Sequence, residues 1–184
     1  MKTIFRTLAA VAALSGLVGC NVLPEQQLDT VRYFTLGSPA PAAVSAEGVT
    51  VKPVRVAGHL RNRSMAVRVA ENEVIYLEDI RWAESLSDAI TQLLRARLGS
   101  VDGNRVVTVE VDRCELVRFE NNRVQLSATY TILSLDEAVA SARGVFTSSP
   151  RTWDGKDYGA LVDEIRAAID ELGDAIAAGL TAKK

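Results

Sequence analysis

Residues 123–133 read RVQLSATYTIL, the clearest alternation of apolar and polar side chains in the chain. The apolar positions are Val124, Leu126, Ala128, Tyr130 and Ile132, and a glutamine, serine or threonine stands between them. Successive side chains of a strand point to opposite faces, so this stretch predicts a strand with one face buried and the other exposed. The fold is therefore expected to contain a sheet.

The segments on either side of this strand extend it into a meander. Residues 105–111 (RVVTVEV) alternate in the same way, and residues 120–122 (ENN) supply a turn. These two strands are predicted to form a hairpin. Residues 138–149 (AVASARGVFTSS) continue the pattern, which indicates a three-stranded antiparallel meander.

Shorter strand-like runs precede the meander. They are residues 33–36 (YFTL), 49–57 (VTVKPVRVA), 65–69 (MAVRV) and 73–77 (EVIYL), with a proline- and alanine-rich spacer at 37–43. Pro53 has no N–H to donate to a neighbouring strand, so its run is expected at an edge of the sheet or with a bulge.

Two stretches have the three- and four-residue periodicity of an amphipathic helix. The first is predicted to begin at Trp82 and to stop at Gly99, with apolar positions at Leu86, Ile90, Leu93, Leu94 and Leu98. The second closes the chain with a long apolar stripe: Tyr158, Leu161, Val162, Ile165, Ala168, Ile169, Leu172, Ile176 and Leu180. Such a stripe must pack on the sheet.

The order of these elements predicts the fold class. Several strands, a helix, a meander and a terminal helix, without an internal repeat, are typical of an α/β domain with a mixed sheet and two main helices. We expect a single three-layer-like domain over residues 32–184.

The first nineteen residues have the layout of a secretory signal peptide. Lys2 and Arg6 form a short basic leader, and residues 7–19 (TLAAVAALSGLVG) are apolar or small. A membrane-spanning helix needs about 20 apolar residues, and this run is shorter. We therefore predict that the chain is exported and that residues 1–19 are removed.

The cysteine that follows has two interpretations. Residues 17–20 (LVGC) resemble the bacterial lipobox, at which the thiol of the cysteine is acylated and the chain is cut before it. Each buried CH₂ contributes about 0.8 kcal/mol, so several acyl chains such as palmitate anchor a protein firmly. The alternative is an ordinary signal peptide cut near Gly16 or Gly19, with Cys20 left free. We predict that Cys20 carries the lipid and that residues 20–31 are a tether.

Charge and cysteine content exclude several classes of protein. The chain has 21 basic and 23 acidic residues, a formal charge of −2, which becomes −4 if Lys2 and Arg6 are removed with the leader. No long basic tract occurs, so nucleic acid is excluded as a partner. An acylated Cys20 cannot form a disulfide with Cys114, the other cysteine. Cys114 lies in a strand-like run and is interpreted as a small apolar side chain.

No sequence pattern indicates catalytic, cofactor-binding or metal-binding residues. His59 is the single histidine, and it stands in the turn-prone GHLRNRS, where a surface position is expected. The sequence lacks G-x-S-x-G, C-x-x-C, H-E-x-x-H and a glycine-rich phosphate loop. We predict that the protein is not an enzyme and that it uses no cofactor and no metal.

Four features together resemble the ABC-type transport auxiliary lipoproteins, the PqiC-like family that accompanies Mce-domain lipid transport systems. They are the lipobox, YFTL at 33–36 (Y-Y-x-L in the family), RWAESL at 81–86 (R-W-A-E-P-L in the family) and Y-x-x-L-V at 158–162. The chain departs from the family at Ser85, where a proline is usual, and at residues 57–63 (AGHLRNR), where a proline-tyrosine-leucine stretch is usual.

The resemblance implies a domain similar to the amino-terminal domain of TolB, on the periplasmic face of the outer membrane of a Gram-negative bacterium. Asn21 favours the outer membrane, because the usual inner-membrane retention signal has aspartate there. The implied role is a non-catalytic adaptor that docks onto an Mce-domain protein and its permease and ATPase, so that lipids or hydrophobic compounds cross the periplasm and the membrane keeps its integrity. A homo-oligomer is compatible with such an adaptor.

The sequence leaves two alternatives to the adaptor open. One is a lipoprotein chaperone or pilotin that assembles an outer-membrane complex, and the other is a lipoprotein hydrolase or peptidoglycan-binding enzyme. Trp82 and Tyr33 are the candidate partner-binding residues, because aromatic side chains are enriched at binding hot spots. Each of them could instead pack in the core.

Overall fold

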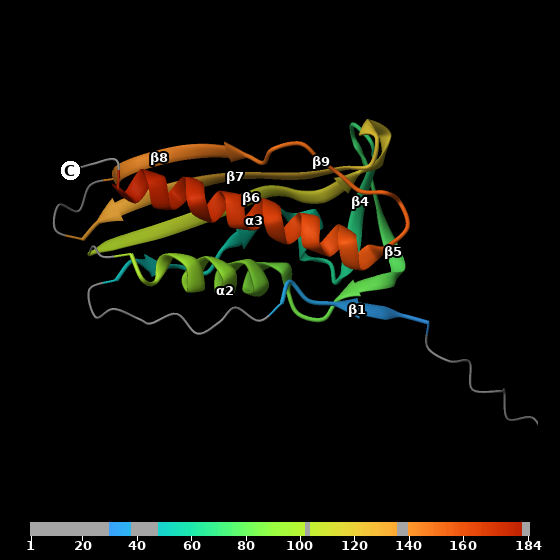
Figure 1. The fold of residues 1–184 in the computed structure, drawn as a ribbon, viewed down its shortest axis with the longest axis horizontal. Coiled ribbons are helices and arrows are strands. Elements are labelled where there is room, and N and C mark those ends of the chain that lie inside the picture. The colour runs from blue at the N-terminus through green and yellow to red at the C-terminus, as the bar shows by residue number, and fades with distance from the viewer. Residues whose placement is uncertain (1–29, 38–47, 102–103, 136–139, 182–184) are drawn as a thin grey trace, which may run out of the picture. The chain divides into compact units, whose positions relative to one another are not determined.

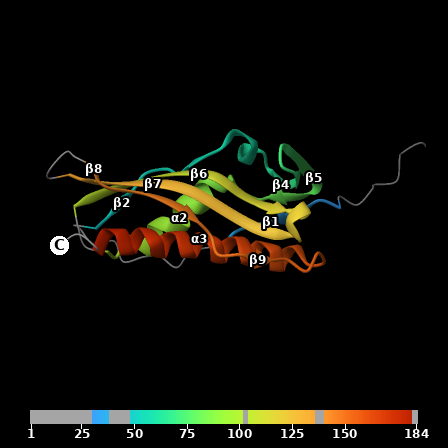
Figure 2. The same ribbon diagram turned by 90° about the horizontal axis from the view of Figure 1, so that it is seen from above.

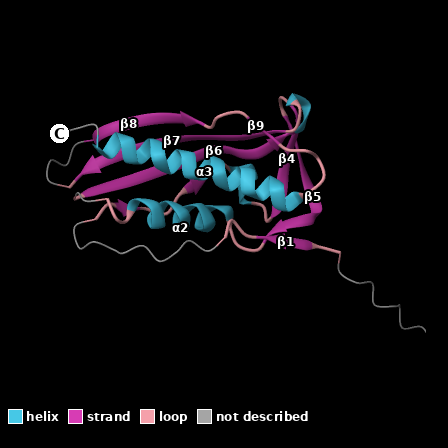
Figure 3. Cartoon of the chain, in the orientation of Figure 1, coloured by secondary structure: helices cyan, strands magenta, loops and turns pink. Residues whose placement is uncertain are grey.

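The computed structural model describes residues 30–37, 48–101, 104–135 and 140–181. The chain divides between Thr30 and Val31 into two compact units, and the described elements belong to the second unit. In the described part of that unit, nine strands form one mixed sheet that carries two α-helices (Figures 1 and 3).

A long hairpin and a third strand form the predicted meander. Strands β6 (Arg105–Val117), β7 (Arg123–Ser134) and β8 (Ala140–Thr147) pair antiparallel in chain order. The short 3₁₀ helix η3 (Arg118–Glu120) joins the first two, and Asn121 and Asn122 follow it with φ of 56° and 53°. Asparagine tolerates this left-handed conformation better than most residues, so the turn expected at 120–122 is confirmed.

The remaining strands extend the sheet from the other side of β6. Strands β2 (Thr50–Val51), β3 (Arg55–Val56) and β4 (Ser64–Ala70) all run parallel to β6. Pro53 lies between β2 and β3, and among the described strands each of these pairs only with β6, so the run lies at an edge, one of the two arrangements expected for it. Strand β5 (Glu73–Trp82) pairs antiparallel with β4, and β1 (Arg32–Phe34) pairs parallel with β5. The main strand order is β1-β5-β4-β6-β7-β8, and β9 (Arg151–Thr152) pairs with the start of β7.

The prediction that Trp82 begins the first helix is wrong. Trp82 is the last residue of β5, and its N–H donates to the C=O of Arg63 at 2.7 Å. Helix α2 (Leu86–Leu98) begins after Ser85, whose Oγ accepts a hydrogen bond from the N–H of Asp88 at 3.1 Å. The helical periodicity extends back to Trp82 because residues 82 and 86 both face the core, although they belong to different elements.

Both helices lie on the same side of the sheet, as Figure 2 shows. Helix α3 (Tyr158–Thr181) crosses β7 and β8, and α2 lies beside it. The two helices approach closely at Gly173, where an added Cβ would lie 2.5 Å from Cδ of Arg97. The expected α/β domain with a mixed sheet and two helices is confirmed. Its helices form one layer, where the sequence suggested a three-layer-like arrangement, because periodicity does not tell which face of a sheet a helix covers.

The core lies between the helices and the sheet. On β7 the side chains of Val124, Leu126, Ala128 and Ile132 are 0–2% exposed, and the residues between them are partly exposed. Burying a side chain such as Ile132 contributes about 1.5–3 kcal/mol to folding. Tyr130, the fifth position predicted on this face, is only partly buried. The predicted strand with one buried face is thus present.

Candidate functional site

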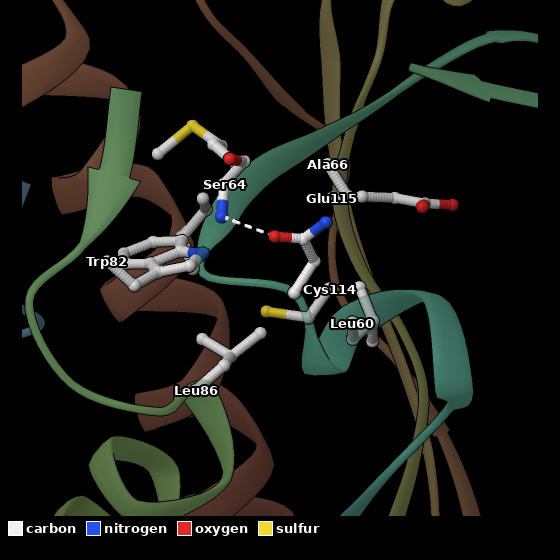
Figure 4. Close-up of a pocket in the computed structure, with 10 residues that line it drawn as sticks. Leu60, Ser64, Ala66, Trp82, Leu86, Cys114 and Glu115 are labelled. Carbon is white, nitrogen blue, oxygen red and sulfur yellow. Dashed lines mark hydrogen bonds between the residues drawn. The ribbon is translucent and has the colours of Figure 1, made fainter. Parts of the chain in front are cut away.

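Trp82 lies in a closely packed region between the end of β5 and the start of α2. Figure 4 shows its indole beside Leu86 and Cys114. Leu60 and Asn62 line the same region, and the N–H of Ser64 donates a hydrogen bond to Asn62 Oδ1 at 3.0 Å. The space among these side chains has no room for a water molecule. Trp82 is 4% exposed, so its ring belongs to the core of the domain.

The thiol of Cys114 points into the same region (Figure 4) and is buried. Burial raises the pKa of Cys114 to about 12, and the negative charge of Glu115 adds to the effect. The thiolate is the reactive form of cysteine, so this side chain is inert at neutral pH. This agrees with the interpretation of Cys114 as a small apolar residue.

A buried ion pair lies on the opposite face of β6 from Cys114. The Glu115 side chain is 0% exposed, and its Oε1 accepts a hydrogen bond from Arg68 Nε on β4 at 2.5 Å. Its Oε2 lies 3.2 Å from Nε2 of His59, in the 3₁₀ helix η2 (Gly58–Arg61). The Tyr76 hydroxyl donates to the C=O of His59 at 3.1 Å. These contacts hold η2 against β5 and β6, and they join β6 to β4.

The sequence pattern does not predict this cluster. Arg68 and Glu115 are 47 residues apart, and no short motif joins them. One signal was present, because Glu115 is the only charged residue in the otherwise apolar run 114–117 (CELV). A carboxylate in such a run needs a buried partner. His59, expected at the surface, has a side chain that is 27% exposed and contacts that carboxylate.

The cluster has the parts of a stabilising network. Both oxygens of Glu115 are engaged, and among the described residues no hydroxyl or thiol bonds the ring of His59. The described residues also contain no group of three or more histidine, cysteine or carboxylate side chains that could hold a metal ion. The arrangement joins β4 to β6 and attaches η2 to β5 and β6.

Tyr33 has a different environment from Trp82. It is 56% exposed on β1, where it pairs in register with Arg81 of β5. The guanidinium of Arg32 lies 5.0 Å from the centre of the Phe34 ring, which holds these neighbouring side chains of β1 together. Of the two candidate partner-binding residues, Tyr33 is the one that a partner could reach on the surface of the domain.

The predicted lipid attachment at Cys20 and the predicted tether up to residue 29 lie outside the described residues. Within the described part of the chain, neither helix combines the length and the apolar character that crossing a membrane requires.

Comparison with known proteins gives a family and a fold. A family model described as ABC-type transport auxiliary lipoprotein component matches residues 34–177. The crystal structure of protein XCC0632 from Xanthomonas campestris, of family DUF330, is similar with a TM-score of 0.65 and 16% identity, over 79% of this chain and 92% of that one. A crystal structure of an uncharacterized protein has a TM-score of 0.65 and 15% identity, over 81% and 97%. No curated protein sequence matches the chain significantly.

Proposed function

We propose that this chain, which belongs to the family of ABC-type transport auxiliary lipoprotein components, is the lipid-anchored and non-catalytic adaptor of a lipid transport system. The observation that supports the proposal is the extent of the family match. It runs from the last residue of β1 to residue 177, so it includes strands β2 to β9, helix α2 and most of α3. Membership in the family gives the chain an auxiliary role in transport.

The proposed anchor is a lipid on Cys20. An extended chain spans at most about 3.5 Å per residue, so residues 21–31 would reach roughly 40 Å from the membrane. Strand β1 follows this segment directly. The edge of the sheet that presents Tyr33 would then be the part of the domain with the shortest link to the bilayer.

The proposed partners are an Mce-domain protein and, through it, a permease and an ATPase. The adaptor would stand on the periplasmic face of the outer membrane, since Asn21 replaces the aspartate of the inner-membrane retention signal. Its contribution would be to position the assembly so that lipids or hydrophobic compounds cross between the membranes. Energy would come from the ATPase.

Labelling with a fatty-acid probe tests the anchor. Wild-type protein is expected to incorporate the probe, and Cys20→Ser is expected to lose the label and to be released from the membrane fraction. Cys114→Ser is the matched control, because it removes the other cysteine, and it should label like the wild type. Equal labelling of wild type and Cys20→Ser would place the anchor elsewhere.

Cross-linking in intact cells followed by affinity purification tests the partner. We expect an Mce-domain protein among the cross-linked species. Recovery of a secretin or of a barrel subunit in its place would contradict the adaptor and support the chaperone or pilotin. A hydrolytic activity that is lost in a folded His59→Gln variant would support the enzyme instead.

A further inference from the structure

A cleft of about 350 Å³ opens between β3, η2 and the first turn of α2. Its floor is apolar, because Val56, Leu60 and Leu86 contribute side chains that are 3–7% exposed. Leu60 and Leu86 also border the packed region around Trp82, so the cleft lies directly outside the core. Arg55 and Arg61 stand at its rim.

The cleft follows the outer edge of β3, which no described strand occupies. Val54 uses this edge to bond α2: its N–H donates to Thr91 Oγ1 at 2.8 Å, and its C=O accepts from Ser87 Oγ at 2.5 Å. Alternate residues of a strand direct their peptide groups to the same edge, so those of Val56 also point there. The cleft therefore begins where the cover provided by α2 ends, beside peptide groups that an added strand could bond.

The charged side chains that line the cleft are all positive. Its lining includes two arginines and no acidic side chain, in a protein whose formal net charge is −2. Arg61 makes no ion pair with any residue that the structure describes. Arg55 lies 3.5 Å from Glu110, but the two side chains are 78% and 57% exposed, and such surface pairs exchange readily for other partners.

We propose that this cleft binds a short, extended, acidic segment of a partner protein, which adds to the edge of β3. The backbone of the segment would bond Val56, its apolar side chains would face Leu60 and Leu86, and its carboxylates would pair with Arg55 and Arg61. Strand addition of this kind obtains affinity from main-chain hydrogen bonds and specificity from alternate side chains. The identity of the complex that contains the partner rests on the proposed function; binding of an acidic segment in the cleft does not.

Direct binding to a defined peptide tests the cleft. The probe is a fluorescent eight-residue peptide of alternating glutamate and valine, titrated into the full lipoprotein in neutral detergent and followed by anisotropy. Arg61→Glu is expected to weaken binding about tenfold or more, and Arg55→Gln is expected to weaken it by a smaller factor. Arg118→Glu is the matched control, because it makes the same charge change on the 3₁₀ helix η3 at the β6–β7 turn, and it should bind like the wild type.

A charge exchange separates recognition from a folding defect. A peptide of alternating lysine and valine should bind Arg61→Glu more tightly than it binds the wild type, a gain that a damaged fold would not produce. The proposal is overturned if the wild type fails to bind the acidic peptide, or if Arg61→Glu and Arg118→Glu bind it equally. It is also overturned if the arginines are needed for binding phosphatidylglycerol vesicles and not for binding the peptide.

Cross-linking in cells distinguishes this inference from the proposed function. If Arg61→Glu loses the peptide and also loses an Mce-domain partner that the wild type recovers, both stand. If Arg61→Glu loses the peptide but the wild type recovers an envelope complex without an Mce-domain protein, the cleft assignment stands and the proposed partner is wrong. If Arg61→Glu retains both the peptide and the Mce-domain partner, the cleft assignment is wrong and the adaptor stands.

Discussion

Strand β6 contributes the glutamates of two Arg–Glu pairs that have the same chemistry and opposite surroundings. The arginines come from β3 and β4. Near its end, Glu115 and Arg68 are 0% and 11% exposed and are joined at 2.5 Å. In its middle, Glu110 and Arg55 are 57% and 78% exposed and lie 3.5 Å apart. The first pair is also contacted by His59 of η2, whereas Arg55 of the second pair lines an open cleft.

The difference shows how burial assigns a role to an ion pair. A buried charge that loses its partner is strongly unfavourable, so the Arg68–Glu115 pair holds β4 and β6 in one arrangement. An exposed pair contributes little to folding, so Arg55 can leave Glu110 for another carboxylate at small cost. The enclosed pair therefore serves the fold, and the open pair is available for binding.

The strongest way to break this comparison is Arg68→Met. The variant leaves the Glu115 carboxylate buried with His59 alone, and we expect it to lower the free energy of unfolding by about 3–5 kcal/mol. Urea denaturation followed by tryptophan fluorescence measures the loss. Arg68→Met combined with Glu115→Leu removes both charges and should recover most of the stability, because apolar residues replace buried pairs well. A single variant within about 1 kcal/mol of the wild type would show that the pair is not needed.

Cys114, the neighbour of Glu115 in β6, tests whether this end of the strand is enclosed. Its pKa of about 12, against an ordinary 9.0, predicts about 1,000-fold less thiolate than in the unfolded chain near pH 8. Iodoacetamide should therefore modify Cys114 only after denaturation, as mass spectrometry of the intact protein can measure. Because the folded-state pKa is the higher one, the associated stability is complete below pH 9 and is lost as the pH rises toward 12. Rapid alkylation of native Cys114 would contradict the enclosed environment.

The smallest expected effect is that of Arg55→Ala at the open end. Removing one partner of an exposed pair should change the free energy of unfolding by about 0.5 kcal/mol or less. The same denaturation experiment checks this value, with Arg68→Met as the comparison variant that is expected to be strongly destabilised. A loss above about 2 kcal/mol would mean that the Arg55–Glu110 pair is structural and would remove the contrast between the two ends.

The meander was predictable from the sequence because its information is local. In residues 123–133 the period of two places Leu126 and Ile132 on one face, and an asparagine turn specifies the hairpin. The end of β5 was not predictable in the same way, because Trp82 has helical spacing to Leu86 and is held in the sheet by Arg63, a residue distant in sequence. Contacts between distant segments have no period.

The candidate sites also differ in whether their residues are close together in the sequence. The predicted lipobox at residues 17–20 is a contiguous motif that can be read directly. Tyr33 could be named as a candidate from its aromatic side chain, but the sequence did not show that it is exposed. The lining of the cleft comes from β3, η2 and α2, whose arginines at 55 and 61 look like ordinary solvated charges in the sequence. Only the folded arrangement shows that they share a rim without an acidic neighbour in the lining.

The position of β1 also has a mechanical consequence. Any pull transmitted along the chain from residues before Thr30 reaches β1 before it reaches any other described element. β1 runs parallel to β5, and just beyond it Arg166 of α3 donates to the C=O of Leu36 at 2.9 Å, so tension would be shared between the sheet and the longer of the two described α-helices.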